Sequence, residues 1–451
     1  MTIMASPAVR TRTTTNVSLR TSGEASLPAP GPRVPLCPFD TRWVTLPPHN
    51  HVFLFPAPSS ETITFPDIVR SLRSSLAKIL SSFHPFAGEI TYSPESRTIA
   101  IICGEDAHVA FVEAETDMEF KRLAEDSAQD VAAFRWLVPD IIREKFPAPV
   151  LAVQVTEFVG DSGGGVAVGV AMNHMAMDGR GFFQFLEMWA AAAKGDDVVA
   201  GKTTDPVLHD RRLLPFEYDD EQVGVYLQHV APGLPRMMQE NHNAPPLSCR
   251  NFTFTASALC HLKELLANVE DTGTKKPSTF VALGAHAWVS IAKCRGFTDG
   301  ARVFAAFPAD CRSLLSPPVP DGYAGNCVTT CLISLTGEEL TGPDGLARAS
   351  SCIRTAIAEV KRDPLAHWRD WFAKVEEIAP GPMVILTGSP TLTCFGMDFG
   401  FGRPARSDLA SIHQDNQVVM SAGRDDGSVQ VSVAITADWM PALTEIFKVD
   451  A

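Results

Sequence analysis

Two apolar runs joined by a glycine-rich stretch constrain the fold of this chain more than any other feature. Over residues 151–156 apolar side chains alternate with Ala, Gln and Thr, and over 166–172 Val and Met return at every second position. Alternation with period two is typical of strands, and a turn-rich connection over 160–165 favours antiparallel neighbours. The sequence therefore predicts a β-hairpin whose second strand delivers His174 at its end.

An amphipathic helix is predicted upstream of this hairpin, over residues 67–83. Its apolar residues recur at three- and four-residue steps, which is the period of a helix with one buried face. Pro85 and Gly88 are expected to end it. The predicted buried residues are Ile68, Leu72, Leu76, Ile79, Leu80 and Phe83.

The second half of the chain has core elements of its own. Ser278 is expected to be the N-cap of a helix that runs to Gly296, and a strand is expected over 303–307. Near the end of the chain, apolar runs over 418–422 and 429–435 flank Asp426-Gly427, which is a strong hairpin signal.

Helices mixed with strands in both halves indicate the α/β or α+β class. A chain of 451 residues exceeds what one core usually holds, so two domains of similar size are expected. The hydrophobic pattern lapses after Lys194, and Arg211-Arg212 is expected to be exposed there. The predicted domains are 1–193 and 226–451, joined by a crossover over 194–225.

The first 22 residues allow two interpretations. They contain arginines at positions 10, 12 and 20 among many Ser and Thr and lack acids, which is typical of an organelle transit peptide. The alternation of Val9, Thr13, Val17 and Leu19 with polar neighbours is instead compatible with an opening strand.

Charge and cysteine usage narrow the class of protein. A formal net charge of −14 with no concentrated basic patch argues against a nucleic-acid partner. The ten cysteines are scattered without a CxxC pair or a secretory signal, as expected for reduced thiols in the cytosol. No apolar run reaches the roughly 18–20 residues of a membrane helix, so no membrane association is expected.

His174 stands where a strand ends, and Asp178-Gly179 follows it. A histidine with a pKa near neutrality can remove a proton from an alcohol or an amine. A strand end followed by small residues also allows the side chain to project into a cleft. The alternative is a hydrogen-bonded core histidine. The functional hypothesis is acyl transfer with His174 as general base.

Three other patterns are better explained as structure. Residues 160–164 imitate the nucleophile loop of trypsin-like proteases without its upstream partners, so a turn is the better interpretation. Asp398-Phe399-Gly400 imitates a kinase motif that lacks its companions. Asp40, His49 and His51 match no strong zinc spacing, so a surface loop is expected there and no metal site is predicted.

Together these segments resemble the BAHD family of plant acyl-CoA-dependent acyltransferases over nearly the whole chain. Residues 174–179 look like the HxxxDG motif of that family, and 398–404 look like its DFGWG signature with Phe401 in place of tryptophan. The resemblance implies two mixed-sheet domains with the active site in a channel between them. The supporting segments are 83–88, 310–312 with 317–318, and the closing hairpin.

Two further segments narrow the branch. Residues 323–327 are similar to the YFGNC motif of the anthocyanin and flavonoid-glucoside acyltransferases, with Ala324 replacing phenylalanine, and 388–390 also fit that branch. This resemblance implies transfer of malonyl from malonyl-CoA to a sugar hydroxyl of a phenolic glucoside. Acyl-CoA is then a co-substrate, and no permanently bound cofactor is implied.

The family also implies roles for individual residues. Asp178 is expected to point away from the substrate and to order the histidine loop through an arginine. Asp398 is expected to be a structural support, with Arg312 as its ion-pair partner. The expected mechanism uses His174 as its one base and forms no acyl-enzyme. The glycines expected to be structural are Gly179, Gly400 and Gly402.

Binding residues for the two ends of the donor are also predicted. Lys275 and Lys276 precede the helix that begins at Ser278-Thr279, and lysines beside a helix N-terminus suit the phosphates of coenzyme A, although a solvated basic loop is an equal alternative. Arg180 could pair with a malonyl carboxylate, or with a nearby acid.

Rival functions remain. One is a hydroxycinnamoyl- or acetyl-transferase of the same fold with a phenolic or amine acceptor. A condensation domain of a peptide synthetase usually doubles the histidine, whereas Asn173 stands there. An inactive metabolite-binding protein is argued against by the intact His174 and Gly179, while Phe401 and Ala324 depart from the family pattern. The expected state is a cytosolic monomer with small-molecule partners only.

Overall fold

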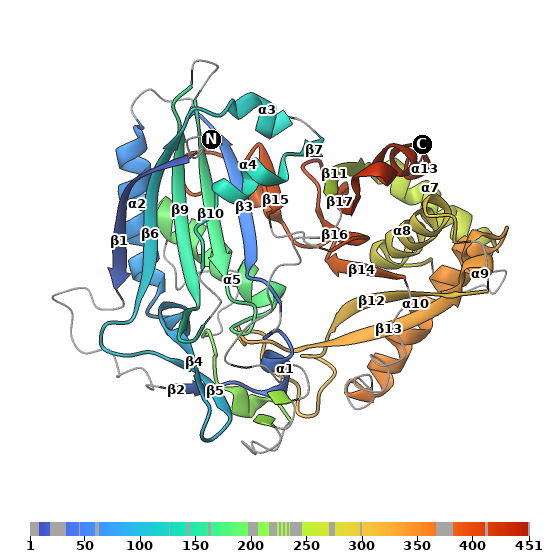
Figure 1. The fold of residues 1–451 in the computed structure, drawn as a ribbon, viewed down its shortest axis with the longest axis horizontal. Helices are drawn as coiled ribbons and strands as arrows, with labels where there is room; N and C mark the ends of the chain where they lie inside the picture. The colour runs from blue at the N-terminus through green and yellow to red at the C-terminus, as the bar shows by residue number, and fades with distance from the viewer. Residues whose placement is uncertain are drawn as a thin grey trace, which may run out of the picture.

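The chain is built around three β-sheets, two of them large, with helices on their faces (Figure 1). The structure is a computed structural model. It describes residues 9–18, 33–44, 46–58, 63–125, 127–141, 145–160, 164–196, 206–215, 223–224, 227–228, 231, 234, 246–269, 276–297, 300–366, 382–410 and 414–449. Strands and helices are mixed in both halves, which confirms the predicted α/β (α+β) class.

The six-stranded sheet has the predicted hairpin near its centre. β9 and β10 pair antiparallel over their whole length, from Leu151 with Met172 to Phe158 with Gly165, which confirms the hairpin. β6 and β9 run parallel, and the other neighbours are antiparallel. The strand order is β1 (Val9–Ser18), β6 (His108–Thr116), β9 (Leu151–Phe158), β10 (Gly165–Met172), β3 (His49–Pro56) and β15 (Arg406–Leu409).

Helices cover both faces of this sheet. α2 (Phe65–Ile79) and α5 (Gly179–Lys194) pack on one face, and α3 (Phe120–Glu125) and α4 (Val131–Trp136) lie on the other (Figure 1). Because both faces are covered, every residue of β10 is buried. The strand that leads to His174 is therefore rigidly held.

The predicted helix over 67–83 is confirmed as α2, and its six predicted core residues are buried. It begins two residues earlier, at Phe65, with Thr64 as its N-cap, and its predicted end is about one turn too late. The helix already ends at Ile79, before Pro85, which lies in a short 3-10 helix, His84–Ala87.

The seven-stranded sheet belongs mostly to the second half of the chain. Its predicted elements are confirmed: a helix capped by Ser278, a strand that contains 303–307, and a hairpin around Gly427, whose φ is +75°. The strand order is β13 (Val328–Thr336), β12 (Arg302–Asp310), β14 (Met383–Gly388), β16 (Gln417–Ala422), β17 (Val429–Thr436), β11 (Leu247–Phe254) and β7 (Ala128–Gln129). Its helices are α7 (Ala256–Val269), α8 (Thr279–Cys294), α9 (Gly337–Thr341), α10 (Gly345–Arg362) and α13 (Met440–Ile446).

The remaining elements are short. The third sheet has the order β2 (Arg33–Pro35), β5 (Thr98–Ile102), β4 (Glu89–Ser93) and β8 (Ala148–Pro149). The other helical segments are α1 (Pro38–Thr41), η3 (Arg211–Leu213), η4 (Cys394–Gly396) and η5 (Ala437–Trp439).

The two large sheets exchange strands. β15 comes from the second half but pairs with β3, and β7 comes from the first half but pairs with β11. The halves are therefore interlocked at the strands as well as joined by the crossover. The boundaries 1–193, 194–225 and 226–451 stay a prediction.

The crossover contains one residue that was predicted wrongly. Arg212 is exposed, as expected, but Arg211 is only 2% exposed. Arg211 tolerates burial because Asp40 and backbone carbonyls accept hydrogen bonds from its guanidinium. Residues 197–205, 216–222 and 225 of the crossover lie outside the described residues.

The opening segment is a strand over residues 9–18, paired with β6, while Leu19 and Arg20 lie outside the described residues. In the part of the chain that the structure describes, no helix combines the length and the apolar character needed to cross a bilayer.

Candidate active site

His174 lies in a turn between β10 and α5. β10 ends at Met172 and α5 begins at Gly179, so the histidine motif spans the connection from strand to helix. Asp178 is the N-cap of α5, and its carboxylate accepts a hydrogen bond from the Gly181 amide at 3.1 Å. The turn is thus tied to the helix that follows it.

The His174 imidazole packs among aromatic rings from the first half of the chain. It stacks on Trp43 with 4.1 Å between ring centroids and meets the edge of His49 at 6.3 Å. Its buried Nδ1 has no hydrogen-bond partner among the described residues. Burial lowers the pKa of His174 below its ordinary 6.5, against the opposing effect of Asp178. The imidazole is therefore neutral near pH 7, as a general base must be.

The Asp178 side chain faces the second half of the chain. It is 2% exposed, and it accepts hydrogen bonds from Arg312 Nη2 at 3.0 Å and from the Cys327 amide at 2.9 Å. Arg312 also donates to the carbonyls of Tyr323 and Gly325. This geometry fits the predicted loop-orienting role of Asp178, with Arg312 as the arginine.

The predicted ion pair between Asp398 and Arg312 is wrong. Arg312 pairs with Asp178, whereas Asp398 accepts hydrogen bonds from the amides of Gly400 at 2.8 Å and Gly402 at 3.1 Å. Asp398 is also only partly buried, so no isolated buried charge arises there. The reason is local: both glycines have positive φ, 96° and 113°, and fold their amides back toward the carboxylate.

The aromatic residues of this second signature belong to the core. Phe401, the departure from the family tryptophan, is 9% exposed and lies edge-on to Phe55 with 4.8 Å between centroids. Phe399 meets Trp189 of α5 at 4.9 Å. The loop thus packs on the first sheet and supports α5, which agrees with a structural role.

A glycine that the sequence analysis missed is more constrained than Gly179. A Cβ at Gly179 would meet nothing within 4 Å, whereas one at Gly181 would overlap the carbonyl oxygen of Ala324. Gly181 therefore permits the close approach of α5 to the segment 323–327 of the second half.

Segment 323–327 lies directly behind the His174 turn. Asn326, fully buried, donates from Nδ2 to the His174 carbonyl at 3.0 Å and to Asp40 at 2.8 Å. Asp40, Trp43, Arg211 and Asn326 were not predicted as site residues. Two signals in the sequence were available for them. Trp43 follows closely on Phe39-Asp40-Thr41, and Asn326 is the asparagine of the YAGNC segment.

The surface-loop interpretation of Asp40, His49 and His51 is wrong. Asp40 lies in α1, and both histidines lie on β3. His51 is 6% exposed and shares a hydrogen bond of 2.8 Å with Ser407 Oγ, and burial lowers its pKa to about 3. Within the described ranges, no group of three or more His, Cys, Asp or Glu is arranged to hold a metal ion.

Arg180 follows the histidine motif at the surface. Its guanidinium donates to Asp321 at 2.8 Å and to Asp310 at 3.4 Å, so the pairing with a nearby acid is what the structure contains. Its use as a reader of malonyl stays a prediction.

The predicted coenzyme A residues gather at the start of α8. Ser278 caps the helix by accepting from the Val281 amide, and Lys263 donates to Thr279 Oγ1 at 2.7 Å. Lys276 is exposed and pairs with Glu264 at 3.3 Å, while Lys275 lies outside the described residues. Their role in binding coenzyme A stays a prediction.

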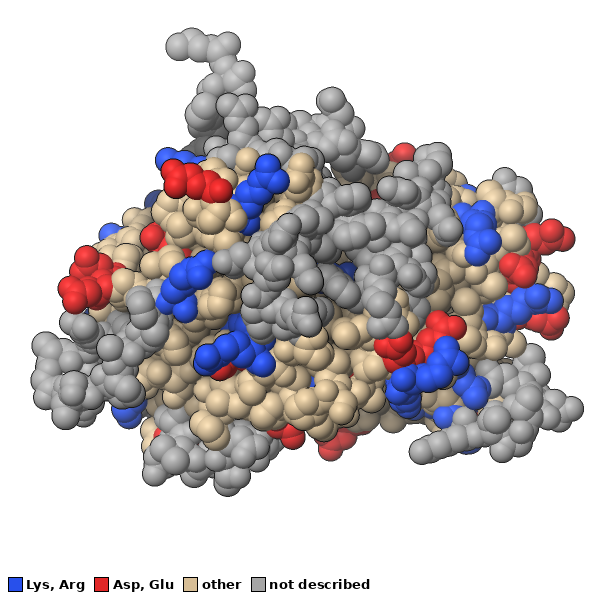
Figure 2. Space-filling model, turned by 90° about the horizontal axis from the view of Figure 1, so that it is seen from below, with Lys and Arg blue, Asp and Glu red and all other residues tan. Residues whose placement is uncertain are grey.

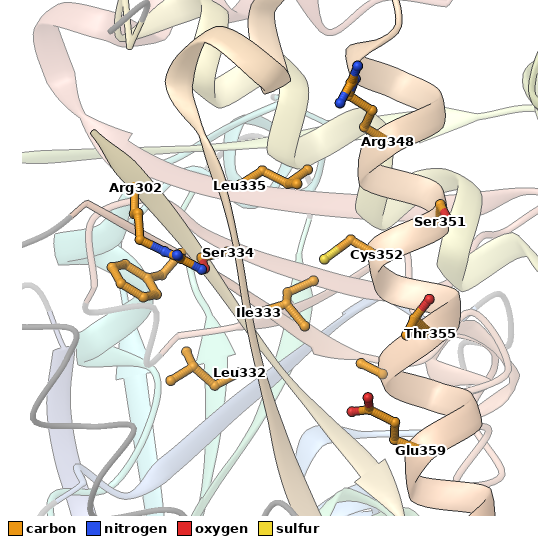
Figure 3. Close-up of a pocket in the computed structure, with 12 residues that line it drawn as sticks. Arg302, Leu332, Ile333, Ser334, Leu335, Arg348, Ser351, Cys352, Thr355 and Glu359 are labelled. Carbon is orange, nitrogen blue, oxygen red and sulfur yellow. The ribbon is translucent and has the colours of Figure 1, made fainter. Parts of the chain in front are cut away.

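A pocket outside the histidine turn is also described. It holds about 580 Å³ between β13 and α10, with Arg302 and Arg348 toward one end and Glu359 toward the other (Figure 3). None of the predicted site residues lines it. On the face shown in Figure 2, the described lysines and arginines lie in small separate groups rather than in one basic surface.

The fold that holds His174 matches that of a solved structure. A neutral histidine follows a central strand at the contact between two halves, and an aspartate held by an arginine anchors its turn. The fold is that of vinorine synthase, with a TM-score of 0.71 over 98% of this chain and 99% of that chain, at 18% identity.

The chain belongs to the Transferase family, the BAHD acyltransferases, whose model matches residues 17–449. It is 26% identical to phenolic glucoside malonyltransferase 1 of Arabidopsis thaliana over 92% of each chain. It is also 26% identical to coumaroyl-CoA:anthocyanidin 3-O-glucoside-6''-O-coumaroyltransferase 1 of the same plant over 93% of each chain. The predicted family is thereby confirmed.

Proposed function

We propose that this acyltransferase moves a malonyl group from malonyl-CoA to a sugar hydroxyl of a flavonoid, anthocyanin or phenolic glucoside. The activity named for the malonyltransferase relative supports the donor and the acceptor. The observation that carries the reaction type is the half-buried, neutral imidazole of His174, with Asp178 turned away from it to Arg312.

In the proposed mechanism His174 accepts the proton of the acceptor hydroxyl while its oxygen attacks the thioester carbonyl. The tetrahedral intermediate collapses with cleavage of the carbon–sulfur bond, and His174 returns the proton to the leaving sulfur. Coenzyme A therefore leaves as a thiol, and no covalent acyl-enzyme forms. A positioned base contributes about 10²- to 10⁴-fold, and holding donor and acceptor together in a channel between the halves supplies much of the remaining acceleration.

The donor is proposed to lie with its nucleotide end near Lys275, Lys276 and the N-cap of α8, where lysine and helix amides favour phosphate. Arg180 is proposed to exchange part of its pairing with Asp321 and Asp310 for the malonyl carboxylate. Its side chain is 44% exposed, so this exchange needs no buried charge to move.

A hydroxycinnamoyl donor is the second candidate. Arg180 already donates to two carboxylates, which leaves it less available to a malonyl group, and the coumaroyltransferase relative is as similar as the malonyltransferase. An uncharged acyl group would need no arginine at this position.

We further propose a monomer located in the cytosol. All ten cysteines lie in described parts of the chain, and no disulfide joins them. Reduced cysteines suit a compartment that keeps thiols reduced.

The proposal is tested by incubating the purified protein with malonyl-, coumaroyl- or acetyl-CoA and a plant phenolic extract, followed by untargeted mass detection. The expected products are glucosides that carry one malonyl group. Coumaroylated products alone would replace malonyl as the donor. Tight acyl-CoA binding without any acylated product would overturn the proposed enzymatic activity and would favour a metabolite-binding protein.

A further inference from the structure

Three successive carbonyl groups of the His174 turn point at the same set of buried donors. Asn326 Nδ2 donates to the carbonyls of His174 at 3.0 Å and Met175 at 3.3 Å. Arg211 Nη2 donates to the Ala176 carbonyl at 2.6 Å. The backbone at this turn is therefore held from one side by two side chains that are distant in sequence.

One carboxylate orients both donors. Asp40 Oδ1 accepts from Asn326 Nδ2 at 2.8 Å, and Asp40 Oδ2 accepts from Arg211 Nε at 3.1 Å. The exposed fractions of Asp40, Arg211 and Asn326 are 0%, 2% and 0%. Such a network is fully desolvated, so its hydrogen bonds are strong and their directions are fixed.

We propose that Asp40, Arg211 and Asn326 form a positioning cluster, which sets the place of the His174 imidazole by fixing the carbonyls of its turn. The three residues act through the backbone of residues 174–176. This inference rests on the proposed role of His174 as base.

The positioning cluster is separate from the Asp178–Arg312 ion pair. That pair holds the far end of the turn, at the N-cap of α5, whereas the cluster holds its first three residues. With both ends fixed, the imidazole stays stacked on Trp43 and its angle to the substrates is set before they bind.

The positioning cluster also connects the crossover to the His174 turn. Asp40 comes from α1, Arg211 from the crossover and Asn326 from the second half, so the three meet only in the folded chain. Arg211 also donates to the carbonyl of His209 within the crossover itself. The crossover is thus fastened to the backbone of the His174 turn.

The test compares Arg211→Met with Arg212→Met, its exposed neighbour that pairs with Asp210. Arg211→Met is expected to lower kcat about 10- to 100-fold, as displacement of a catalytic group by about 1 Å does. KM for donor and acceptor is expected to stay within about twofold, because neither substrate touches the cluster. Arg212→Met should match wild type.

The pKa of His174 supplies a readout that mere loss of stability would not move. The groups that act on the imidazole are Asp178, Arg42, His49 and Asn326, and Arg211→Met changes none of them. Once released, the ring becomes more hydrated, so its pKa should rise toward 6.5. NMR of protein labelled on the histidine rings follows this, with the His174 signal assigned by its absence in His174→Ala.

Asn326→Ser is the second variant, should Arg211→Met fold poorly. It removes the bonds to two carbonyls without leaving a buried charge, and the same fall in kcat with nearly unchanged KM is expected. Because Asn326 itself raises the pKa of His174, the pKa readout is kept for Arg211→Met. Arg211→Lys should restore activity only in part, because one ammonium cannot replace the guanidinium fork.

Two outcomes separate this inference from the proposed function. In the first outcome His174→Ala destroys transfer, while Arg211→Met and Asn326→Ser both keep the kcat of Arg212→Met and Arg211→Met also keeps its His174 pKa. The positioning cluster is then overturned, and the role of His174 as base is retained. If His174→Ala keeps the wild-type rate of transfer, the role of His174 as base is overturned. The positioning role of the cluster is then overturned as well.

Discussion

The two signature segments, 174–179 and 398–402, contain an aspartate with one and two glycines, respectively, yet the aspartates serve different purposes. Asp178 is 2% exposed and reaches across to Arg312 of the second half. Asp398 is partly buried and accepts hydrogen bonds only from two amides of its own loop among the contacts described. The first carboxylate ties two halves together at the base, and the second shapes one loop.

This difference shows that the hydrogen-bonding partner of an aspartate, and not its presence in a motif, decides how much it contributes to stability. A buried ion pair leaves an uncompensated charge when one member is removed, at about 3–5 kcal/mol. A side chain bonded to backbone amides near the surface contributes about 0.5–1.5 kcal/mol for each hydrogen bond. The two segments should therefore separate clearly in experiments.

The largest expected effect is on stability at the first segment. Arg312→Met leaves the Asp178 carboxylate buried without its cation, so the free energy of unfolding should fall by about 3–5 kcal/mol. Denaturant unfolding measures this. Arg70→Met, which removes an exposed arginine paired with Asp67, is the matched control and should change stability by less than about 1 kcal/mol. Equal losses in both variants would break the comparison.

At the second segment the expected loss is smaller. Asp398→Ala removes two hydrogen bonds to the amides of Gly400 and Gly402, so unfolding should become easier by about 1–3 kcal/mol. The rate per folded molecule should stay within about threefold of wild type, since Asp398 touches no substrate in the proposed mechanism. A hundredfold loss of kcat in folded Asp398→Ala would place it in the chemistry.

The pH dependence of kcat sharpens the contrast. Burial lowers the pKa of His174, so the base stays neutral on acidification and activity should fall only as the pH drops through a value below 6.5. Asp398→Ala should leave this acid limb unchanged. A wild-type midpoint above 6.5 would contradict the burial of the base.

The smallest expected effect concerns Arg180, just beyond the first segment. An exposed arginine–carboxylate contact is worth about 1 kcal/mol or less, so Arg180→Ala should reduce kcat/KM for malonyl-CoA about fivefold more than for coumaroyl-CoA. Initial rates with both donors measure it. Equal losses would remove Arg180 as the reader of the malonyl carboxylate.

Local patterns in the sequence predicted most of the fold. The hairpin that delivers His174, the buried face of α2 and the cap at Ser278 were all found, because each depends on residues close in sequence. The predicted end of α2 was about one turn too late, because the helix ends at Ile79, well before Pro85.

The partners within the site could not be predicted in the same way. Arg312 was assigned to Asp398 although it pairs with Asp178, 134 positions away. Arg211 was expected to be exposed because a charged residue in a polar stretch usually is, and its partner Asp40 lies 171 positions away. Such pairings depend on how the two halves meet, which no local periodicity encodes.

The most direct test of the account is the rate of coenzyme A release by His174→Ala, measured beside wild type and beside His108→Ala, an exposed histidine on β6. The rate of His174→Ala is expected to be about a hundredth of the wild-type rate or less, with an unchanged thermal melt. The rate of His108→Ala is expected to match wild type. A His174→Ala protein that keeps more than about a tenth of the wild-type rate would contradict it.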